Sequence, residues 1–441
     1  MALKPLDIYK LLPKKNCKEC REPTCLSFAM KLAQGKAEPD SCPYLDEEAK
    51  QSLSSQTRAP IQKIVIGKGT RSFTVGEEYV FYRHDKTFFH QPGIIYTISD
   101  TSSEEEIRKT IRTVREDILT RIGINLQVDG LAIRADSGSP DRFKEVVTIA
   151  TEGGDIPLVL ITKDPALMEA GLFICGHYNP LIYAATKETA DQFCDLAKRY
   201  DASLVVTADT LPDIGRLARY CTEKGAKKIL LDLSGENCGQ FLTRSTITRQ
   251  LALARTSPEL SYPVFLDGGS HTMDYLVTGV VKFASVIVTP PLSQAEMKTA
   301  LVLRQNIYTD PQKPIQMTPG LYRIGNPGRN SPVFMTVNFS LTFFTLQGYL
   351  EATRVPCFLL IVETEGMSVL TSVAAGKLNE TVVKEWLDKT ALASEVDSKK
   401  LIIPGYAAPL SGRIEELTGW KVLVGPRDAA DVGKYLLEEW K

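Results

Sequence analysis

Four cysteines stand close together near the start of the chain, and their spacing is its clearest sign of chemistry. They are Cys17, Cys20, Cys25 and Cys42, and Pro43 follows the last of them. Iron–sulfur clusters are held by four thiolates, usually three close together and one from further along the chain. Structural zinc favours two short pairs of ligands, whereas here 16 residues separate Cys25 from Cys42. The spacing therefore predicts a cluster of the 4Fe–4S type, with zinc and unligated thiols as the alternatives.

The residues around these cysteines predict a small module. Residues 26–35 have the amphipathic pattern of a short helix, which would present Phe28 and Leu32 to the apolar shell of the cluster. Residues 51–57 are polar and typical of a linker. Five more cysteines are scattered singly, and we expect them to be reduced core thiols rather than parts of a disulfide framework. These five are Cys175, Cys194, Cys221, Cys238 and Cys357.

Composition and charge exclude several classes of protein. The chain has 441 residues and a net charge of −1, which argues against a broad electrostatic surface for nucleic acid. Apolar residues make up 43% of it, enough for at least one large core. No apolar run approaches the roughly 20 residues that span a bilayer. Residues 1–15 lack the apolar segment and cleavage site of a signal peptide. We expect a cytoplasmic protein that binds neither nucleic acid nor membrane.

The middle of the chain alternates short apolar runs with helical patterns. Runs that are apolar throughout indicate strands buried on both faces, and their alternation with helices indicates a parallel sheet. About eight such repeats predict a TIM (β/α)8 barrel. Residues 73–100 look instead like an antiparallel hairpin covering one end of the barrel. The expected strands are 61–66, 130–134, 158–162, 181–185, 204–207, 228–232, 263–267 and 286–289, and the expected helices are 104–121, 187–200, 211–224 and 296–305.

The C-terminal part predicts a second α/β unit. Residues 311–331 are rich in Pro, Gly and Asn, which indicates a domain boundary. About 110 residues follow, the size of a doubly wound Rossmann- or flavodoxin-like domain. The expected strands are 332–339, 358–364, 400–404 and 422–425, and the expected helices are 341–352, 381–390, 410–419 and 428–440. We therefore predict three domains, at residues 1–57, 58–312 and 313–441.

Polar residues at the carboxyl ends of the barrel strands are candidates for catalytic groups, because TIM-barrel active sites lie there. They match no known acid–base constellation. Aspartates after strands commonly cap turns or helices, which is the simpler interpretation of Asp164, Asp209 and Asp267. The candidates are Asp136, Asp164, His177, Asp209, Asp267 and His271. The barrel is therefore expected to be a scaffold or a docking face.

Three glycine-bearing loops follow expected strands of the C-terminal domain, at residues 365–372, 404–409 and 425–428. In such sheets, ligands bind beyond the carboxyl ends of the strands. Glycine lets the backbone approach a ligand, and a following helix offers N–H groups to a phosphate. The dinucleotide fingerprint Gly-x-Gly-x-x-Gly is absent. By loop chemistry alone, ordinary capping turns and a cofactor site both remain open.

Taken together, these features resemble a known family. The segment Asn16-Cys17-Lys18-Glu19-Cys20-Arg21-Glu22-Pro23-Thr24-Cys25, with Ser41-Cys42-Pro43, is similar to the iron–sulfur domain of membrane electron-transport ferredoxin subunits and of the corrinoid/iron–sulfur protein. A cluster module, a barrel and a Rossmann-like domain in this order resemble the large (gamma) subunit of the corrinoid/iron–sulfur protein of the acetyl-CoA decarbonylase/synthase system. The resemblance covers essentially the whole chain.

The resemblance implies a methyl carrier. Its corrinoid cobalt would accept a methyl group from methyl-tetrahydrofolate or another pterin through a methyltransferase and pass it to acetyl-CoA synthase. The 4Fe–4S cluster would return cob(II) to cob(I). A small subunit would complete a heterodimer. The corrinoid would lie among residues of the C-terminal domain: Ser340, Thr342, Gly366, Met367, Ser368, Val369, Leu370, Thr371, Ser372, Gly405, Tyr406, Ala407, Ala408, Gly425, Pro426 and Arg427.

The histidines bear on how cobalt would be bound. Corrinoid proteins that ligate cobalt with histidine share an Asp-x-His-x-x-Gly signature, but Phe88 stands where Asp would precede His90. From residue 332 on there is no histidine. No histidine of this domain is therefore expected to ligate cobalt, which agrees with the base-off, histidine-off corrinoid that the resemblance implies. Two rivals remain: an iron–sulfur electron-transfer subunit without corrinoid, and a zinc-stapled barrel enzyme acting on a pterin.

Overall fold

The N-terminal module is built around a few buried apolar residues. The computed structural model describes residues 5–33, 37, 39–46, 49–50, 53, 59–85, 88–154, 156–269, 272–310 and 314–440. Helices α1 (Pro5–Leu11) and α2 (Cys25–Ala33) and a 3-10 turn (Pro39–Ser41) form this module. Ile8, Phe28 and Leu32 are buried together with Cys25 and Cys42. The predicted helix is thus α2, while residues 34–35 and most of the predicted linker lie outside the described residues.

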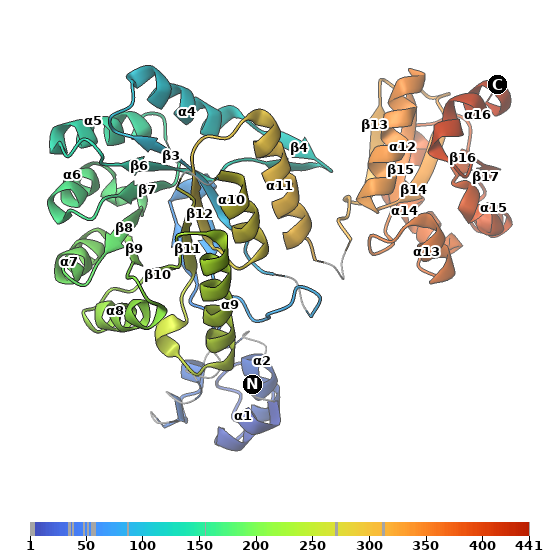
Figure 1. Cartoon of the computed structure of the whole chain (residues 1–441). Helices are drawn as coiled ribbons and strands as arrows, with labels where there is room; N and C mark the ends of the chain where they lie inside the picture. Colours follow the sequence, from blue (N-terminus) through green and yellow to red (C-terminus); the bar gives the residue numbers. More distant parts are fainter. Residues whose placement is uncertain are drawn as a thin grey trace. The chain divides into compact units, whose positions relative to one another are not determined.

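Eight parallel strands of the described chain close into a barrel in the order β3-β6-β7-β8-β9-β10-β11-β12, and β12 pairs with β3. Helices surround it (Figure 1). The strands are β3 (Gly93–Ser99), β6 (Gly130–Arg134), β7 (Leu158–Ile161), β8 (Leu181–Ala185), β9 (Ser203–Val206), β10 (Ile229–Asp232), β11 (Val264–Asp267) and β12 (Val286–Thr289). The helices are α4 (Glu104–Glu116), α5 (Pro140–Thr151), α6 (Pro165–Cys175), α7 (Ala190–Tyr200), α8 (Leu211–Glu223), α9 (Cys238–Ala254), α10 (Thr272–Val281) and α11 (Gln294–Tyr308). The predicted (β/α)8 barrel is confirmed.

One strand assignment was wrong, because residues 61–66 are not part of the barrel. Strand β1 (Ile64–Ile66) pairs antiparallel with β2 (Phe73–Val75), and the first barrel strand is β3, inside the segment expected to be a hairpin. Gly67 and Gly69, at φ 82° and 80°, lie where the chain reverses. Ile64, Ile66 and Val75 pack against inward-facing barrel residues. A hairpin does cover one end of the barrel, but it is built from residues 64–75.

The predicted helix 104–121 was too long. Helix α4 ends at Glu116, and β4 (Leu119–Arg121) pairs with β5 (Ile124–Leu126). The turn between these strands is Ile122-Gly123, at φ 53° and 68°. Two consecutive positive φ values are what a two-residue hairpin turn requires, so the chain reverses here. Thr120–Asn125, the tip of this hairpin, groups with the C-terminal residues in a second compact unit that otherwise starts at Thr309.

The C-terminal domain is a doubly wound sheet with helices on both faces. Its strand order is β13-β15-β14-β16-β17, and all but β13 are parallel. Helices α12 and α16 pack on one face, and α14 and α15 on the other. The parallel strands follow the flavodoxin-like order. The strands are β13 (Gly320–Ile324), β14 (Val333–Val337), β15 (Cys357–Val362), β16 (Lys400–Ile403) and β17 (Lys421–Val424); the helices are α12 (Ser340–Thr353), α13 (Val369–Ala374), α14 (Glu380–Lys389), α15 (Ser411–Thr418) and α16 (Val432–Glu439).

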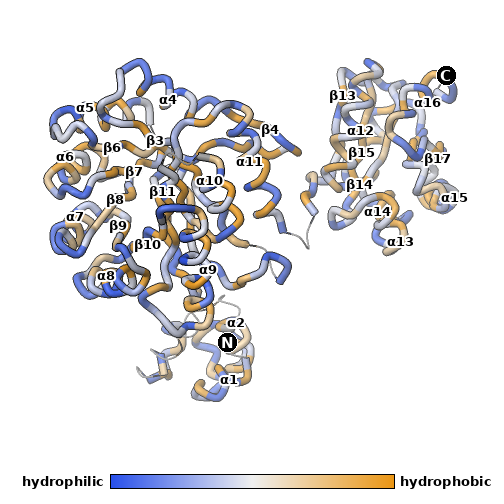
Figure 2. Tube along the Cα trace, in the orientation of Figure 1, coloured by the Kyte–Doolittle hydropathy of each residue, from blue (hydrophilic) through white to orange (hydrophobic). Residues whose placement is uncertain are grey.

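Hydropathy follows this architecture. Hydrophobic residues run along the strands of both units, and hydrophilic ones line the outer turns of α5 to α8 (Figure 2). Strand β13 lies within the Pro- and Gly-rich segment that was expected only as a boundary. The predicted domain limits at 57/58 and 312/313 fall on residues outside the described ranges. Among the described helices, none is both long and apolar enough to cross a membrane.

Candidate functional site

The four predicted cluster ligands come together. Cys17, Cys20, Cys25 and Cys42 line one small cavity. Cys25 and Cys42 are buried, Cys20 is half-buried and Cys17 is exposed. Among the described side chains, no three His, Cys, Asp or Glu are arranged to hold a single metal ion. The thiols thus surround a shared space and do not meet at one point.

The backbone of the cysteine loop has an unusual conformation. Lys14, Asn16, Lys18 and Arg21 have φ values of 56°, 50°, 67° and 64°. Non-glycine residues rarely adopt positive φ, and such residues cluster at functional sites. Turns that contain left-handed residues can direct successive N–H groups to one side and form a concavity for anions, including Fe–S centres. One of these groups, the N–H of Asn16, donates to Cys25 Sγ at 3.4 Å. The loop therefore suits an anionic cluster.

Polar contacts hold the loop against α2. The N–H of Cys25 donates to Asn16 Oδ1 at 2.8 Å. Glu22 accepts from Ser27 Oγ at 3.0 Å and pairs with Lys31, whose hydrogen bond lowers the pKa of Glu22. Across the site, Tyr44 donates to Glu19 at 2.7 Å, which raises the pKa of Tyr44. These contacts fix the segments that carry the cysteines.

A second site lies at the carboxyl end of the C-terminal sheet. Strands β14 and β16 are neighbours in the sheet. The chain runs from β14 to β15 on one side of β14, and then from β15 to β16 on the other side of β14. Such a switch point opens a crevice where ligands bind. A cavity of about 240 Å³ lies there, between the ends of these strands, α12 and the loops after β16 and β17. The topology thus creates the pocket.

The lining of this pocket is mostly apolar. Its polar groups include Thr336 and, at the exposed rim, Arg427, whose guanidinium lies 5.7 Å from the ring centre of Tyr406. Thr336 is 1% exposed, and its hydroxyl has no hydrogen-bond partner in the described structure. The nearby hydroxyl of Ser340, also buried, is likewise unpartnered. A buried hydroxyl without a partner is costly, so Thr336, which lines the pocket, suits a ligand with polar atoms, whereas Ser340 is not part of the lining.

The predicted corrinoid-binding residues divide into two groups. Those that line the pocket are Thr342, Val369, Tyr406, Gly425, Pro426 and Arg427. Those that are not part of its lining are Ser340, Gly366, Met367, Ser368, Leu370, Thr371, Ser372, Gly405, Ala407 and Ala408.

Local structure accounts for several residues of the second group. Ser368 caps α13, accepting from the N–H of Thr371, and the Ser372 hydroxyl donates to the carbonyl of Val369. Ala407 is part of the core. A Cβ on Gly405 would lie 2.8 Å from the backbone nitrogen of Arg427, so glycine there lets two loops approach closely. The Ser368 hydroxyl thus acts as an ordinary helix cap, and the Ser372 hydroxyl is satisfied within α13.

The strand and helix residues of the pocket were not predicted from the sequence. Thr336 is a single polar residue within the apolar strand Val333–Val337, and this could have drawn attention to it. The apolar lining gave no comparable signal, because it looks like core sequence. The residues missed are Phe334, Met335, Thr336, Leu341, Thr345, Leu346, Ile402, Ile403, Pro404, Ala429 and Val432.

At the carboxyl end of the barrel, the polar groups bind one another. Arg134 donates to both carboxylate oxygens of Asp267, at 2.7 and 2.6 Å. Asp232 accepts from Tyr183 at 3.0 Å and from Thr207 at 2.9 Å. These bonds link residues of different barrel strands, or residues just after them, at this end of the barrel. Their oxygens are already occupied by protein donors.

The other barrel candidates are also accounted for. Asp164 caps α6 by accepting from two backbone N–H groups, as predicted. Asp136 and Asp209 are exposed, and the cap of α8 is Thr210. The ring of His177 lies 4.0 Å from that of Tyr178. His271 lies outside the described residues.

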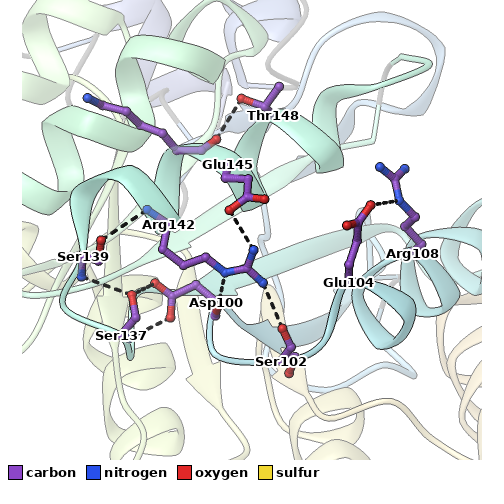
Figure 3. A network of polar contacts seen from close by, with 10 residues as sticks. Asp100, Ser102, Glu104, Arg108, Ser137, Ser139, Arg142, Glu145 and Thr148 are labelled. Carbon is purple, nitrogen blue, oxygen red and sulfur yellow. Dashed lines mark hydrogen bonds and ion pairs between the residues drawn. The ribbon is translucent and has the colours of Figure 1, made fainter.

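A network beside this end of the barrel fastens two loops (Figure 3). Asp100, which is fully buried, accepts from the N–H of Ser137 at 2.8 Å. Its own carbonyl accepts from Arg142, which also donates to the carbonyl of Ser102. The network joins the end of β3 to the start of α5, which is a structural role.

A cysteine-lined cluster loop, a (β/α)8 barrel and a doubly wound domain with a crevice at its switch point define a multidomain cofactor-carrying protein. The chain belongs to the CO dehydrogenase/acetyl-CoA synthase delta subunit family, whose model matches residues 63–436. Residues 12–44 match a model of an Fe–S cluster module. The predicted resemblance is confirmed by the relatives below.

The chain is 37% identical over 436 residues, 98% of each chain, to the corrinoid/iron–sulfur protein large subunit of Moorella thermoacetica. It is 34% identical over 455 residues, 99% of this chain and 98% of the other, to the acetyl-CoA decarbonylase/synthase complex subunit gamma of Methanopyrus kandleri. Part of the chain is similar to the solved dihydropteroate synthase of Thermus thermophilus, at 15% identity, a TM-score of 0.38, and coverage of 56% of this chain and 100% of that one.

Proposed function

We propose that this chain is a methyl carrier that binds a corrinoid in its C-terminal domain and a 4Fe–4S cluster in its N-terminal module. The observation that carries the proposal is the cavity at the switch point of the C-terminal sheet, with the buried unpartnered hydroxyl of Thr336. The name of the Moorella thermoacetica relative supports it, since that name combines a corrinoid with an iron–sulfur centre. The division into domains 1–57, 58–312 and 313–441 is part of this proposal.

The pocket residues fit the nucleotide tail of a corrinoid. That tail carries an aromatic base, a ribose and a phosphate, which need an apolar cavity, hydroxyl partners and a cation. Leu346 and Val432 supply apolar wall, Thr336 a hydroxyl and Arg427 a positive charge at the rim. Leu341 and Tyr406, which are 58% and 46% exposed, offer apolar surface for the broad corrin ring. A base held in the protein is away from the cobalt, and since this domain has no histidine, the expected state is base-off without a histidine ligand.

The cysteine loop fits a cluster better than zinc. The four thiols surround a cavity, and the same loop contains left-handed residues of the kind found in anion-binding turns. The bound corrinoid would supply the cobalt that takes the methyl group and gives it up again, and the cluster would supply single electrons that restore cob(I). We propose as partners a small subunit, a methyltransferase for methyl-tetrahydrofolate or a related pterin, and acetyl-CoA synthase.

Filling the pocket tests the proposal. Ala429 lines the pocket and its neighbour Ala430 is exposed, so Ala429→Trp and Ala430→Trp are a matched pair. We expect anaerobically purified wild type and Ala430→Trp to contain cobalt, iron and acid-labile sulfide and to have corrinoid bands in the visible spectrum. Ala429→Trp should lose most of its cobalt and keep its iron and sulfide.

Other outcomes separate the rivals. Iron and sulfide without cobalt in the wild type, after reconstitution with corrinoid, would favour an electron-transfer subunit. Zinc in place of iron and sulfide would favour a zinc-stapled barrel enzyme. Equal cobalt contents in the two tryptophan variants would place the corrinoid elsewhere.

A further inference from the structure

Asn16 is bonded to the ligand Cys25 in two ways. Its backbone N–H donates to Cys25 Sγ at 3.4 Å, and its side-chain Oδ1 accepts from the N–H of Cys25 at 2.8 Å. The second bond ties the cysteine loop to the first residue of α2, which begins at Cys25. One residue therefore both contacts the ligand sulfur and fixes the segment that carries it.

The backbone of Asn16 is held in a conformation that few residues adopt readily. Its φ is 50°, in the left-handed region, where Asn is better tolerated than most residues because its short side chain can bond locally. Here that local bond is the one to Cys25. If the side-chain oxygen were absent, the turn would lose the hydrogen bond that holds it against Cys25. The N–H of Asn16 would then no longer be directed at the sulfur.

A directed N–H group changes the electron affinity of a cluster. Hydrogen bonds to cluster sulfurs are among the factors that set the reduction potential. The reduced cluster is the more negatively charged state, so a donor stabilises it more than the oxidised state and raises the potential. Cys25 is only 7% exposed, and in low-dielectric surroundings the bond is less weakened by water.

We propose that Asn16 is a positioning residue that sets the reduction potential of the cluster, its side chain holding the turn in which its own N–H donates to the sulfur of Cys25. This inference rests on the proposed cluster at Cys17, Cys20, Cys25 and Cys42. It extends that proposal from the ligands to a residue that binds no iron.

Three variants test the inference. Asn16→Gly keeps the left-handed conformation accessible but removes the Oδ1 hydrogen bond, and Asn16→Ala removes both. Ile8→Ala is the structural control, because Ile8 is buried in the same module but does not line the thiol cavity. We expect the midpoint potential of the cluster to become more negative in Asn16→Gly and still more negative in Asn16→Ala. In Ile8→Ala it should equal that of the wild type, at full iron and sulfide content.

A measurement on the wild type keeps the test decisive if a variant fails to take up the cluster. Asn16 is the only asparagine in residues 1–57, so labelling with ¹⁵N-asparagine marks one backbone nitrogen near the cluster. Pulsed electron paramagnetic resonance of the reduced protein should detect coupling to this ¹⁵N. Absence of the coupling, or wild-type potentials in loaded Asn16→Gly and Asn16→Ala, would overturn the role of Asn16 alone. Absence of iron and sulfide from the wild type would overturn the cluster itself.

Discussion

Some functional residues can be predicted from their type and spacing in the sequence, whereas others can be recognised only in the folded structure. The four cysteines could be predicted as a group because thiolates are the ligands that clusters need, and their spacing favours a cluster over paired zinc ligands. Thr336 could not be identified in that way. Its role depends on being buried at the end of β14 beside β16, and that neighbourhood is set by strand order. Asn16 was likewise invisible, because its φ and its bonds to Cys25 exist only in the folded loop.

Thr336 provides a test at this scale. Thr336→Val keeps the branched shape but removes a buried hydroxyl that has no partner. We expect the corrinoid-free domain to become more stable by about 1 kcal/mol, because the cost of the buried unpaired group disappears. If the ligand supplies the missing partner, corrinoid affinity should fall, by roughly 2- to 12-fold for a hydrogen bond of about 0.5–1.5 kcal/mol.

Denaturant unfolding of the corrinoid-free protein and corrinoid titration measure the two effects. Thr345→Val is the matched control, because Thr345 also lines the pocket but is exposed, so that water can satisfy its hydroxyl. It should change stability little. Equal affinities of Thr336→Val and wild type would mean that the hydroxyl does not face the ligand.

At the scale of elements, apolar runs located most barrel strands correctly, because strands buried on both faces are apolar throughout. The same rule failed for residues 61–66. In β1 the central Val65 is exposed, so the strand alternates, and three residues are too few for the alternation to be recognised. The prediction that the helix starting at residue 104 continues to residue 121 was wrong for a different reason. There the hairpin turn at Ile122-Gly123 outweighs helical periodicity.

The β1–β2 hairpin should contribute directly to barrel stability. Ile66 is fully buried against the barrel interior, whereas its neighbour Val65 is 40% exposed. Ile66→Ala should destabilise the barrel by about 2–5 kcal/mol through lost burial and a residual cavity. Val65→Ala should cost far less, within about 1 kcal/mol.

Two probes localise this effect. All three tryptophans, Trp386, Trp420 and Trp440, are in the C-terminal domain. Far-ultraviolet circular dichroism should therefore report the shifted barrel transition, while the tryptophan fluorescence transition stays in place. A parallel shift of both transitions would show that the barrel and the C-terminal domain unfold together.

For the whole molecule, the organising feature is that the two proposed cofactor sites belong to different modules. The cysteines lie in a module with its own small core, and the ligand pocket belongs to a different compact unit. The order of modules could be predicted from the sequence because each has its own pattern: clustered cysteines, repeated strand–helix units, and a second α/β segment after a Pro- and Gly-rich boundary. The pairing order within the C-terminal sheet, which creates the pocket, depends on tertiary contacts that no local pattern records.

If the two sites have separate roles, one can be disabled without the other. Cys20→Ala removes a cluster ligand and leaves the C-terminal pocket untouched. We expect protein that was reduced beforehand, and then freed of reductant, to transfer methyl groups at the wild-type rate, because the cobalt alone carries the methyl group. Reduction of protein left in the cob(II) state should be abolished, because the electron has no route from the donor to the cobalt. Loss of the paramagnetic signal of cob(II) measures this reduction. Cys238→Ala, at a scattered half-buried thiol outside the cluster loop, should retain both activities. Loss of both activities in a normally folded Cys20→Ala protein would contradict separate roles and would mean that the cluster also takes part in methyl transfer.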